Sequence, residues 1–168
     1  LPYQVYRHRL GTSVADDQLI YEETDDTFYV GLEKTISNKY ILIHISSTTT
    51  SEILMLDADD TDATPQTFLT RRRDHEYSLD HYRDTFYIRS NKEGKNFGLY
   101  QSASADEKAW QPIICARDDV MLEGFSLFKD WLVVEEREQG LTHLRQIHWQ
   151  SGEEKHIRFD DPTYMTWL

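Results

Sequence analysis

The sequence predicts an all-β protein: a partial β-propeller of about three and a half four-stranded antiparallel blades. Its apolar stretches are short and rich in β-branched and aromatic residues, as in Tyr40–Ile45, Thr85–Arg89 and Trp131–Val134. Such stretches favour the pleated surface of a sheet. No stretch carries apolar residues at the i, i+3, i+4, i+7 spacing of an amphipathic helix, so no long helix is expected.

Two strands open the chain, at Gln4–His8 and Gln18–Tyr21, and they match the third and fourth strands of a blade. Three sets of four strands follow, separated by clusters of Asn, Asp, Ser and Gly that favour turns. The first set is predicted at Asp26–Val30, Tyr40–Ile45, Glu52–Leu56 and Gln66–Leu69; the second at Glu76–Leu79, Thr85–Arg89, Phe97–Tyr100 and Gln111–Ile114; the third at Glu123–Leu127, Trp131–Glu136, His143–His148 and Lys155–Phe159. A last strand is predicted at Tyr164–Leu168.

These strands divide one propeller domain into parts. We expect the second half of a blade at 1–24, blades at 25–73, 74–118 and 119–161, and the first strand of a next blade at 162–168. A closed propeller needs about four to eight blades, so we expect the chain to be a piece of a longer polypeptide. An antiparallel sandwich with coincidental spacing is the alternative fold.

Composition excludes several classes of protein. The chain has 18 Lys and Arg against 30 Asp and Glu, a net charge of −12, whereas a nucleic-acid binder needs a surplus of basic residues. No apolar run approaches the roughly 20 residues of a membrane helix. The single cysteine, Cys115, excludes an internal disulfide framework.

Motifs for catalysis or metal binding are not found in the sequence. Gly-x-Ser-x-Gly, the nucleophile elbow, is absent. The acidic run Asp57–Asp62 fails the EF-hand pattern, because Asp62 and Phe68 stand where that loop needs Gly and Glu. The seven histidines show no metal-ligand spacing. We expect no catalytic residue, no metal site and no cofactor in this chain.

An acidic residue precedes each predicted inner strand of a blade. If the sheets form a propeller, these residues would line one mouth of its channel and favour cationic visitors. Ordinary turn chemistry is the alternative. The four candidates for this substrate filter are Asp26, Glu76, Glu123 and Asp161.

The chain has one basic cluster, Arg71, Arg72 and Arg73, between the first two sets of four strands. It is a candidate for contact with another domain, or for clamping a carboxylate. Local pairing with Asp74 and Glu76 is the alternative.

Several long motifs carry a family resemblance. The stretch Tyr6–Thr12 followed by Asp17–Glu23 resembles the non-catalytic propeller of the prolyl oligopeptidase family of serine peptidases. The stretches that look like its oligopeptidase B branch, also called protease II, are Thr50–Ile53, Arg71–Tyr82, Gly94–Tyr100, Leu122–Phe125 and Trp131–Arg137.

The resemblance implies a seven-bladed propeller that covers an α/β-hydrolase domain of the same polypeptide. The hydrolase domain would carry the Ser-Asp-His triad and the acidic pockets for Arg or Lys side chains. The parent would be a cytoplasmic oligopeptidase that cleaves short basic peptides after Arg or Lys, and its propeller would reject folded proteins by size. A propeller-type interaction module without enzymatic activity is the alternative. Open blade edges further predict that the chain associates with itself.

Overall fold

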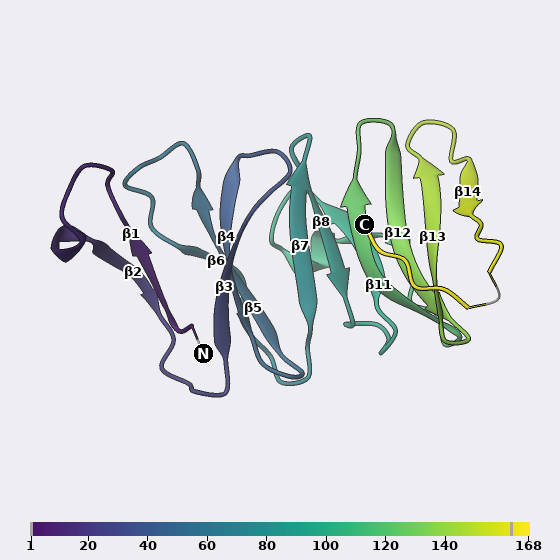
Figure 1. The fold of residues 1–168 in the computed structure, drawn as a ribbon, viewed down its shortest axis with the longest axis horizontal. Helices are drawn as coiled ribbons and strands as arrows, with labels where there is room; N and C mark the ends of the chain where they lie inside the picture. Colours follow the sequence, from purple (N-terminus) through teal and green to yellow (C-terminus); the bar gives the residue numbers. More distant parts are fainter. Residues whose placement is uncertain (1, 162) are drawn as a thin grey trace. The chain divides into compact units, whose positions relative to one another are not determined.

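The computed structural model describes residues 2–161 and 163–168 (Figure 1). Within these residues the chain forms fourteen strands and two 3₁₀ helices of one turn each, η1 (Val14–Asp16) and η2 (Glu107–Ala109). Two compact units divide the chain, residues 1–83 and 84–168. The all-β class predicted from the sequence is confirmed.

The first unit contains a two-stranded sheet, a four-stranded sheet and one further strand. Strands β1 and β2 pair with each other, and β3 to β6 form an antiparallel sheet in chain order. The strands are β1 (Gln4–Arg7), β2 (Gln18–Glu22), β3 (Tyr29–Lys34), β4 (Tyr40–Ser46), β5 (Ser51–Asp57), β6 (Gln66–Leu69) and β7 (Tyr77–Tyr82).

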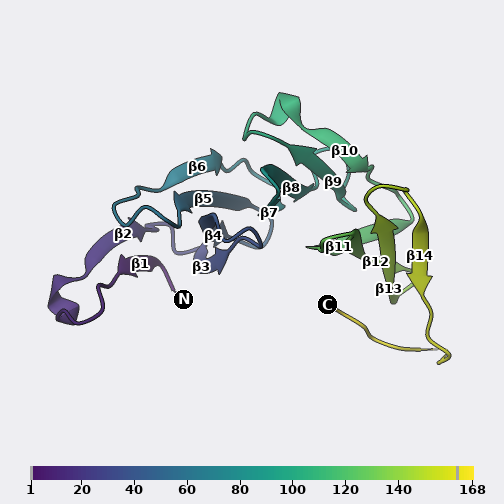
Figure 2. The same ribbon diagram turned by 90° about the horizontal axis from the view of Figure 1, so that it is seen from above.

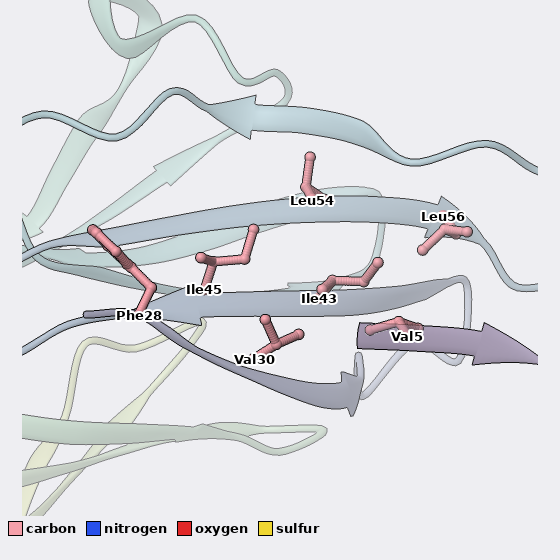
Figure 3. Packing of buried hydrophobic residues seen from close by; sticks show 7 residues of the cluster. All are labelled: Val5, Phe28, Val30, Ile43, Ile45, Leu54 and Leu56. Atoms are coloured by element: carbon pink, nitrogen blue, oxygen red, sulfur yellow. The ribbon is translucent and has the colours of Figure 1, made fainter. Parts of the chain in front are cut away.

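Alternation of side chains across the pleat builds the core of this unit. On one face of the sheet, Val30 lies opposite Ile45 and Ile43 lies opposite Leu54. Figure 3 shows these residues with Val5 of β1, Phe28 and Leu56. The apolar face of β3–β5 is therefore covered by β1 and β2, which contribute Val5 and the half-buried Ile20 and Tyr21.

The turn between β3 and β4 is fastened to β7. The backbone N–H of Ser37 donates to the carbonyl of His81 at 3.0 Å, and the Ser37 hydroxyl lies 2.8 Å from Nδ1 of His81. The N–H of Ile36 donates to the Asp80 carboxylate at 2.9 Å. Burial raises the pKa of Asp80, although the N–H groups of Ile36 and His81 oppose this shift. His81 is thus part of the packing between these strands.

The second unit contains β8 to β14 (Figure 2). Strand β9 pairs with both β8 and β10, and β11 to β14 form an antiparallel sheet in chain order. The strands are β8 (Thr85–Ser90), β9 (Gly98–Ser102), β10 (Gln111–Ile114), β11 (Val120–Leu127), β12 (Trp131–Glu138), β13 (Leu141–His148) and β14 (Glu154–Ile157).

Three predicted strands differ from the structure by more than two residues at their first residue or in their existence. Strand β3 begins at Tyr29 instead of Asp26, and β11 begins at Val120 instead of Glu123. The strand predicted at Tyr164–Leu168 is wrong, because these residues form no strand. Their polar contacts are made to side chains: the Tyr164 hydroxyl lies 2.9 Å from Nδ1 of His143, and the N–H of Leu168 donates to the Glu135 carboxylate at 3.3 Å. A strand requires a backbone ladder, which such contacts do not supply.

Candidate functional site

An acidic hollow lies where the chain passes from β2 to β3, and it contains the candidate Asp26. The hollow has a volume of about 540 Å³ and is lined by Tyr3, Glu22, Glu23, Thr24, Asp25, Asp26 and Phe28. The turn there is held by Asp25, whose carboxylate accepts hydrogen bonds from the N–H and the hydroxyl of Thr27 at 3.0 and 2.6 Å. These bonds lower the pKa of Asp25. The carboxylates of Glu22, Glu23, Asp25 and Asp26 therefore line one concave surface.

Arg71 lies beside this hollow and is held by two carboxylates. Its Nη2 is 2.5 Å from Glu23 and its Nε is 2.7 Å from Glu52, while its guanidinium lies 4.2 Å from the centre of the Phe28 ring. The sequence offered Arg71 as a domain contact or a carboxylate clamp, and in the structure it is a clamp within its own unit. Its partners, however, are not the neighbouring acids that the sequence suggested.

Ionisation of this cluster is shifted by burial and by its ion pairs. Burial opposes the charge on Glu23, but hydrogen bonds from Arg71, the Asp25 N–H and the Tyr21 hydroxyl hold its pKa below the ordinary value. Burial and the nearby Glu23 carboxylate raise the pKa of Tyr21 to about 12. Arg71 stays protonated, because its two carboxylates outweigh the effect of burial and raise its pKa.

The other two arginines of the basic cluster differ from Arg71. The Arg72 guanidinium is 3.2 Å from Nδ1 of His75. The Arg73 side chain is 95% exposed and its Nε is 3.6 Å from the Asp74 carboxylate. Arg73 is therefore the member that remains accessible for contact with another domain, which stays a prediction.

The remaining acidic candidates occupy different positions in the fold. Glu76 is half-buried and directly precedes β7. Glu123 lies within β11, where Arg137 binds its carboxylate through Nε and Nη2 at 2.6 and 3.1 Å. Asp161 is exposed and follows β14. Asp26 and Glu76 belong to the first unit and the other two to the second, so the ring around a channel mouth stays a prediction.

A buried ion-pair network in the second unit was not predicted from the sequence. The Glu136 carboxylate accepts from Nε and Nη2 of Arg145 at 2.9 and 2.6 Å, and from Arg117. Arg145 also donates to Glu154 at 3.0 Å. Burial opposes the charge on Glu136, but these arginines hold its pKa below the ordinary value. Glu136 stands in phase with the buried Leu132 and Val134, which is a signal that the sequence did contain.

Among residues 2–161 and 163–168, no group of three or more His, Cys, Asp or Glu side chains is arranged to hold a metal ion. The same residues include no helix with the length and apolarity needed to cross a membrane.

Comparison with known proteins gives consistent matches over the whole chain. The profile of the "Prolyl oligopeptidase, N-terminal beta-propeller domain" family matches residues 1–168. The "Protease 2" of Moraxella lacunata is 37% identical over 97% of this chain, and the "Dipeptidyl aminopeptidase BI" of Pseudoxanthomonas mexicana is 38% identical over 98%. The chain spans 23% of the length of each of these two relatives.

Solved structures show the same fold. Oligopeptidase B from Trypanosoma brucei has a TM-score of 0.85 and 24% identity over 95% of this chain and 24% of its own. Oligopeptidase B from Leishmania major has a TM-score of 0.86 and 21% identity over the same shares. The four-stranded antiparallel sheets are therefore propeller blades.

Proposed function

This chain belongs to the prolyl oligopeptidase family, as part of its N-terminal β-propeller domain, and we propose that it is the non-catalytic segment of an oligopeptidase that cleaves short peptides after Arg or Lys. The observation that carries the proposal is the 37% identity to a "Protease 2" along almost the entire chain. The relatives are serine peptidases by family, so the parent is a hydrolase in this proposal.

Charge supports a basic substrate. The chain carries a net charge of −12, and Glu22, Glu23, Asp25 and Asp26 line one hollow. A negative field raises the local concentration of cationic peptides and speeds their encounter with the protein. Neutral or acidic peptides gain nothing from this field.

The proposed mechanism assigns the chemistry and the filtering to different parts of the polypeptide. A triad serine in the α/β-hydrolase domain attacks the carbonyl carbon of the basic residue, and an oxyanion hole stabilises the tetrahedral intermediate. The peptide bond then breaks, the amine of the next residue leaves with a proton, and water releases the acyl group from the serine. The propeller covers that site, admits short flexible peptides and excludes folded proteins, and movement between the domains gates entry. The exposed Arg73 is our candidate for the contact with the hydrolase domain.

The lone Cys115 favours a reducing compartment, and we propose the cytoplasm.

The test uses the complete polypeptide and matched chromogenic peptides that end in Arg, Lys, Pro or Ala. We expect kcat/KM to be highest for Arg and Lys. A preference for Pro or Ala would contradict the specificity.

The size filter is tested with an Arg-containing loop presented either as a short peptide or inside a stable folded protein, and equal cleavage of both would contradict it.

The similarity to a "Dipeptidyl aminopeptidase BI" points to a competing activity, release of dipeptides from a free N-terminus. A peptide with a blocked N-terminus distinguishes the two. An oligopeptidase that cuts after Arg hydrolyses the blocked peptide, whereas an aminopeptidase requires the free amine. An interaction module without activity would hydrolyse neither the blocked peptide nor the same peptide with a free N-terminus.

A further inference from the structure

The tip of the hairpin between β3 and β4 is fastened to the end of β7 through backbone groups of both segments. The N–H of Ile36 donates to Oδ1 of Asp80 at 2.9 Å, and the N–H of Ser37 donates to the carbonyl of His81 at 3.0 Å. The N–H of His81 donates to the same Oδ1 of Asp80 at 2.7 Å. We call these four residues, Ile36, Ser37, Asp80 and His81, the hairpin clasp.

The Asp80 side chain can hold its two hydrogen bonds in either protonation state. Both N–H groups donate to Oδ1, so a proton can bind Oδ2 without breaking either bond. A protonated carboxyl group still accepts hydrogen bonds through its other oxygen. Whether the charged or the neutral form holds the clasp more firmly therefore depends on what surrounds the carboxyl group.

A second carboxylate, that of Glu33 on β3, acts on Asp80. His44 of β4 lies directly opposite Gly31, which has no side chain, so the imidazole reaches the diagonal neighbour Glu33. Nε2 of His44 is 3.1 Å from the Glu33 carboxylate. A hydrogen bond from His44 lowers the pKa of Glu33, although burial opposes this shift. Glu33 therefore stays negatively charged in neutral solution.

The surroundings of Asp80 favour its neutral form. Burial raises the pKa of Asp80 most strongly, its two N–H donors lower it, and the charge of Glu33 raises it further, with a net rise. When the clasp opens, the carboxyl group returns to water, where its pKa is about 3.9. The closed clasp thus binds a proton more tightly than the open one, so proton uptake stabilises the closed form. This stabilisation is lost as pH rises through the raised pKa of Asp80.

His44 provides a second proton site that acts in the same direction. Its side chain is 23% exposed and that of Glu33 is 65% exposed, so protons reach the pair from water. Histidine side chains change charge between about pH 5 and 8. On the acid side of that range His44 is a cation and compensates the charge of Glu33. On the basic side this compensation is lost, and Glu33 repels a charged Asp80.

The other ionisable groups around the clasp do not reverse this dependence. The Ser37 hydroxyl, 2.8 Å from Nδ1 of His81, can donate to a neutral imidazole or accept from a charged one. Lys39 in the hairpin tip and Arg83 after β7 each lie over an aromatic ring, at 5.6 and 5.0 Å from its centre. Lysine and arginine side chains keep their charge between about pH 5 and 8.

We propose that the hairpin clasp is a proton-sensitive latch: a proton on Asp80 or His44 tightens it, and loss of both protons loosens the hairpin tip from β7. Strands β3 and β7 are the predicted inner strands of two blades, and inner strands border the channel of a propeller. The latch therefore controls how firmly two neighbouring parts of the channel wall are joined. This inference concerns conformational change and is independent of the proposed function.

Hydrogen exchange of the complete polypeptide tests the latch. Exchange rates of residues 35–40 are divided by those of the unstructured peptide at the same pH, which gives protection factors. We expect protection to be at least about threefold higher at about pH 5.5 than at about pH 8. The turn at Ser47–Thr50, closed by the N–H of Ser47 on the carbonyl of Thr50 at 2.9 Å, is the internal reference and should show no such difference. An equal difference in both turns, or none at residues 35–40, would overturn the proposal.

Substitutions separate the contributions of the two carboxylates. Asp80→Asn keeps an oxygen for both N–H groups and carries no charge, so we expect high protection of residues 35–40 at both pH values. Glu33→Gln, at a mostly exposed side chain, removes the repulsion and should raise protection at about pH 8 by about twofold. Asp59→Asn, at an exposed position between β5 and β6, is the matched control and should keep the full pH difference.

A pH difference that persists in Asp80→Asn contradicts the latch. If Asp80→Asn does not fold, Glu33→Gln decides alone: protection that does not increase at about pH 8 overturns the proposal. Neither readout involves peptide cleavage, so these results leave the proposed substrate preference untouched.

Discussion

Two arginine side chains, Arg71 and Arg145, each hold two carboxylates in the folded chain. Glu23 and Glu136, one partner of each, are buried. A carboxylate that has left water is stable only while its ion pairs and hydrogen bonds are complete. Removing one partner therefore lowers the free energy of unfolding by more than the intact pair contributes to it, whereas fully exposed pairs contribute little.

Arg71→Met tests this at the acidic hollow. The substitution keeps the apolar stem but leaves Glu23 and Glu52 without their cation, so we expect a loss of about 2–4 kcal/mol in the free energy of unfolding. Urea unfolding measures it. Arg73→Met is the matched control, since that side chain is almost fully exposed, and it should leave the midpoint unchanged. Equal effects of both substitutions would contradict the clamp.

The ionisation of Glu136 should make the free energy of unfolding depend on pH. Its pKa is lowered in the folded chain, while in the unfolded chain it stays near about 4.3. The unfolded chain then binds the proton first as pH falls, so the stability that Glu136 contributes is present above about pH 5 and is lost as pH falls through the folded pKa.

Glu136→Gln should flatten the decline of unfolding free energy with falling pH in this window, and should also reduce stability at neutral pH. Denaturant titrations at a series of pH values measure both effects. Glu138→Gln makes the same change at an exposed position of the same strand and should preserve the slope. An unaltered slope in Glu136→Gln would show that this carboxylate is not held by its arginines.

At the residue scale, the sequence showed which side chains form a cluster more successfully than it showed which residues they bind. The three arginines were recognised as a cluster, but which of them is buried depends on Glu23 and Glu52, which are 48 and 19 residues away from Arg71. Such pairings depend on how sheets pack, and this is not visible in local spacing. Glu136 could have been found from its phase on a buried strand face.

At the scale of single elements, strand β9 lies between β8 and β10. This position leaves little room for a side chain at its first residue, Gly98. A Cβ added to Gly98 would lie 2.9 Å from the carbonyl oxygen of Ile114 and 3.0 Å from the Tyr100 hydroxyl. The backbone at Ile114 cannot move away from such a Cβ without disturbing the bulge between β9 and β10.

Gly98→Ala should therefore destabilise the chain by about 1–3 kcal/mol, the usual effect of overpacking. Thermal or urea unfolding measures it. Gly31→Ala is the control within a strand, because a Cβ at Gly31 meets nothing within 4 Å, and it should be neutral or slightly stabilising. Tolerance of alanine at Gly98 would contradict the close approach of β9 and β10.

At the element scale, alternating patterns located the strands well because half of each strand faces a core. Strand ends were less predictable: the first residues of β3 and β11 depend on turns and a bulge. Tyr164–Leu168 has the composition of a strand but no backbone ladder. Composition indicates what a strand tolerates, while a neighbouring strand is required to form one.

For the whole molecule, the repeat of four strands predicted the propeller fold, and the family profile and the solved structures confirmed it. The acidic ring involves both units and stays a prediction. Its consequence for the complete polypeptide can be measured as salt dependence of peptide cleavage, because long-range attraction is screened as ionic strength rises.

We expect kcat/KM of the complete polypeptide for an Arg-ended peptide to fall several-fold between about 0.01 and 0.5 M salt. A peptide with an uncharged side chain at that position, equal in length, should change far less. If the two peptides respond alike to salt, the negative charge does not steer the substrate.

Labelling with a fluorophosphonate probe that reacts with activated serines tests the central claim most directly. The account predicts that the complete polypeptide is labelled on a serine outside the 168 residues, and that the 168-residue chain alone is not labelled. A probe adduct on any serine within this chain would contradict its assignment as the non-catalytic part of a serine peptidase.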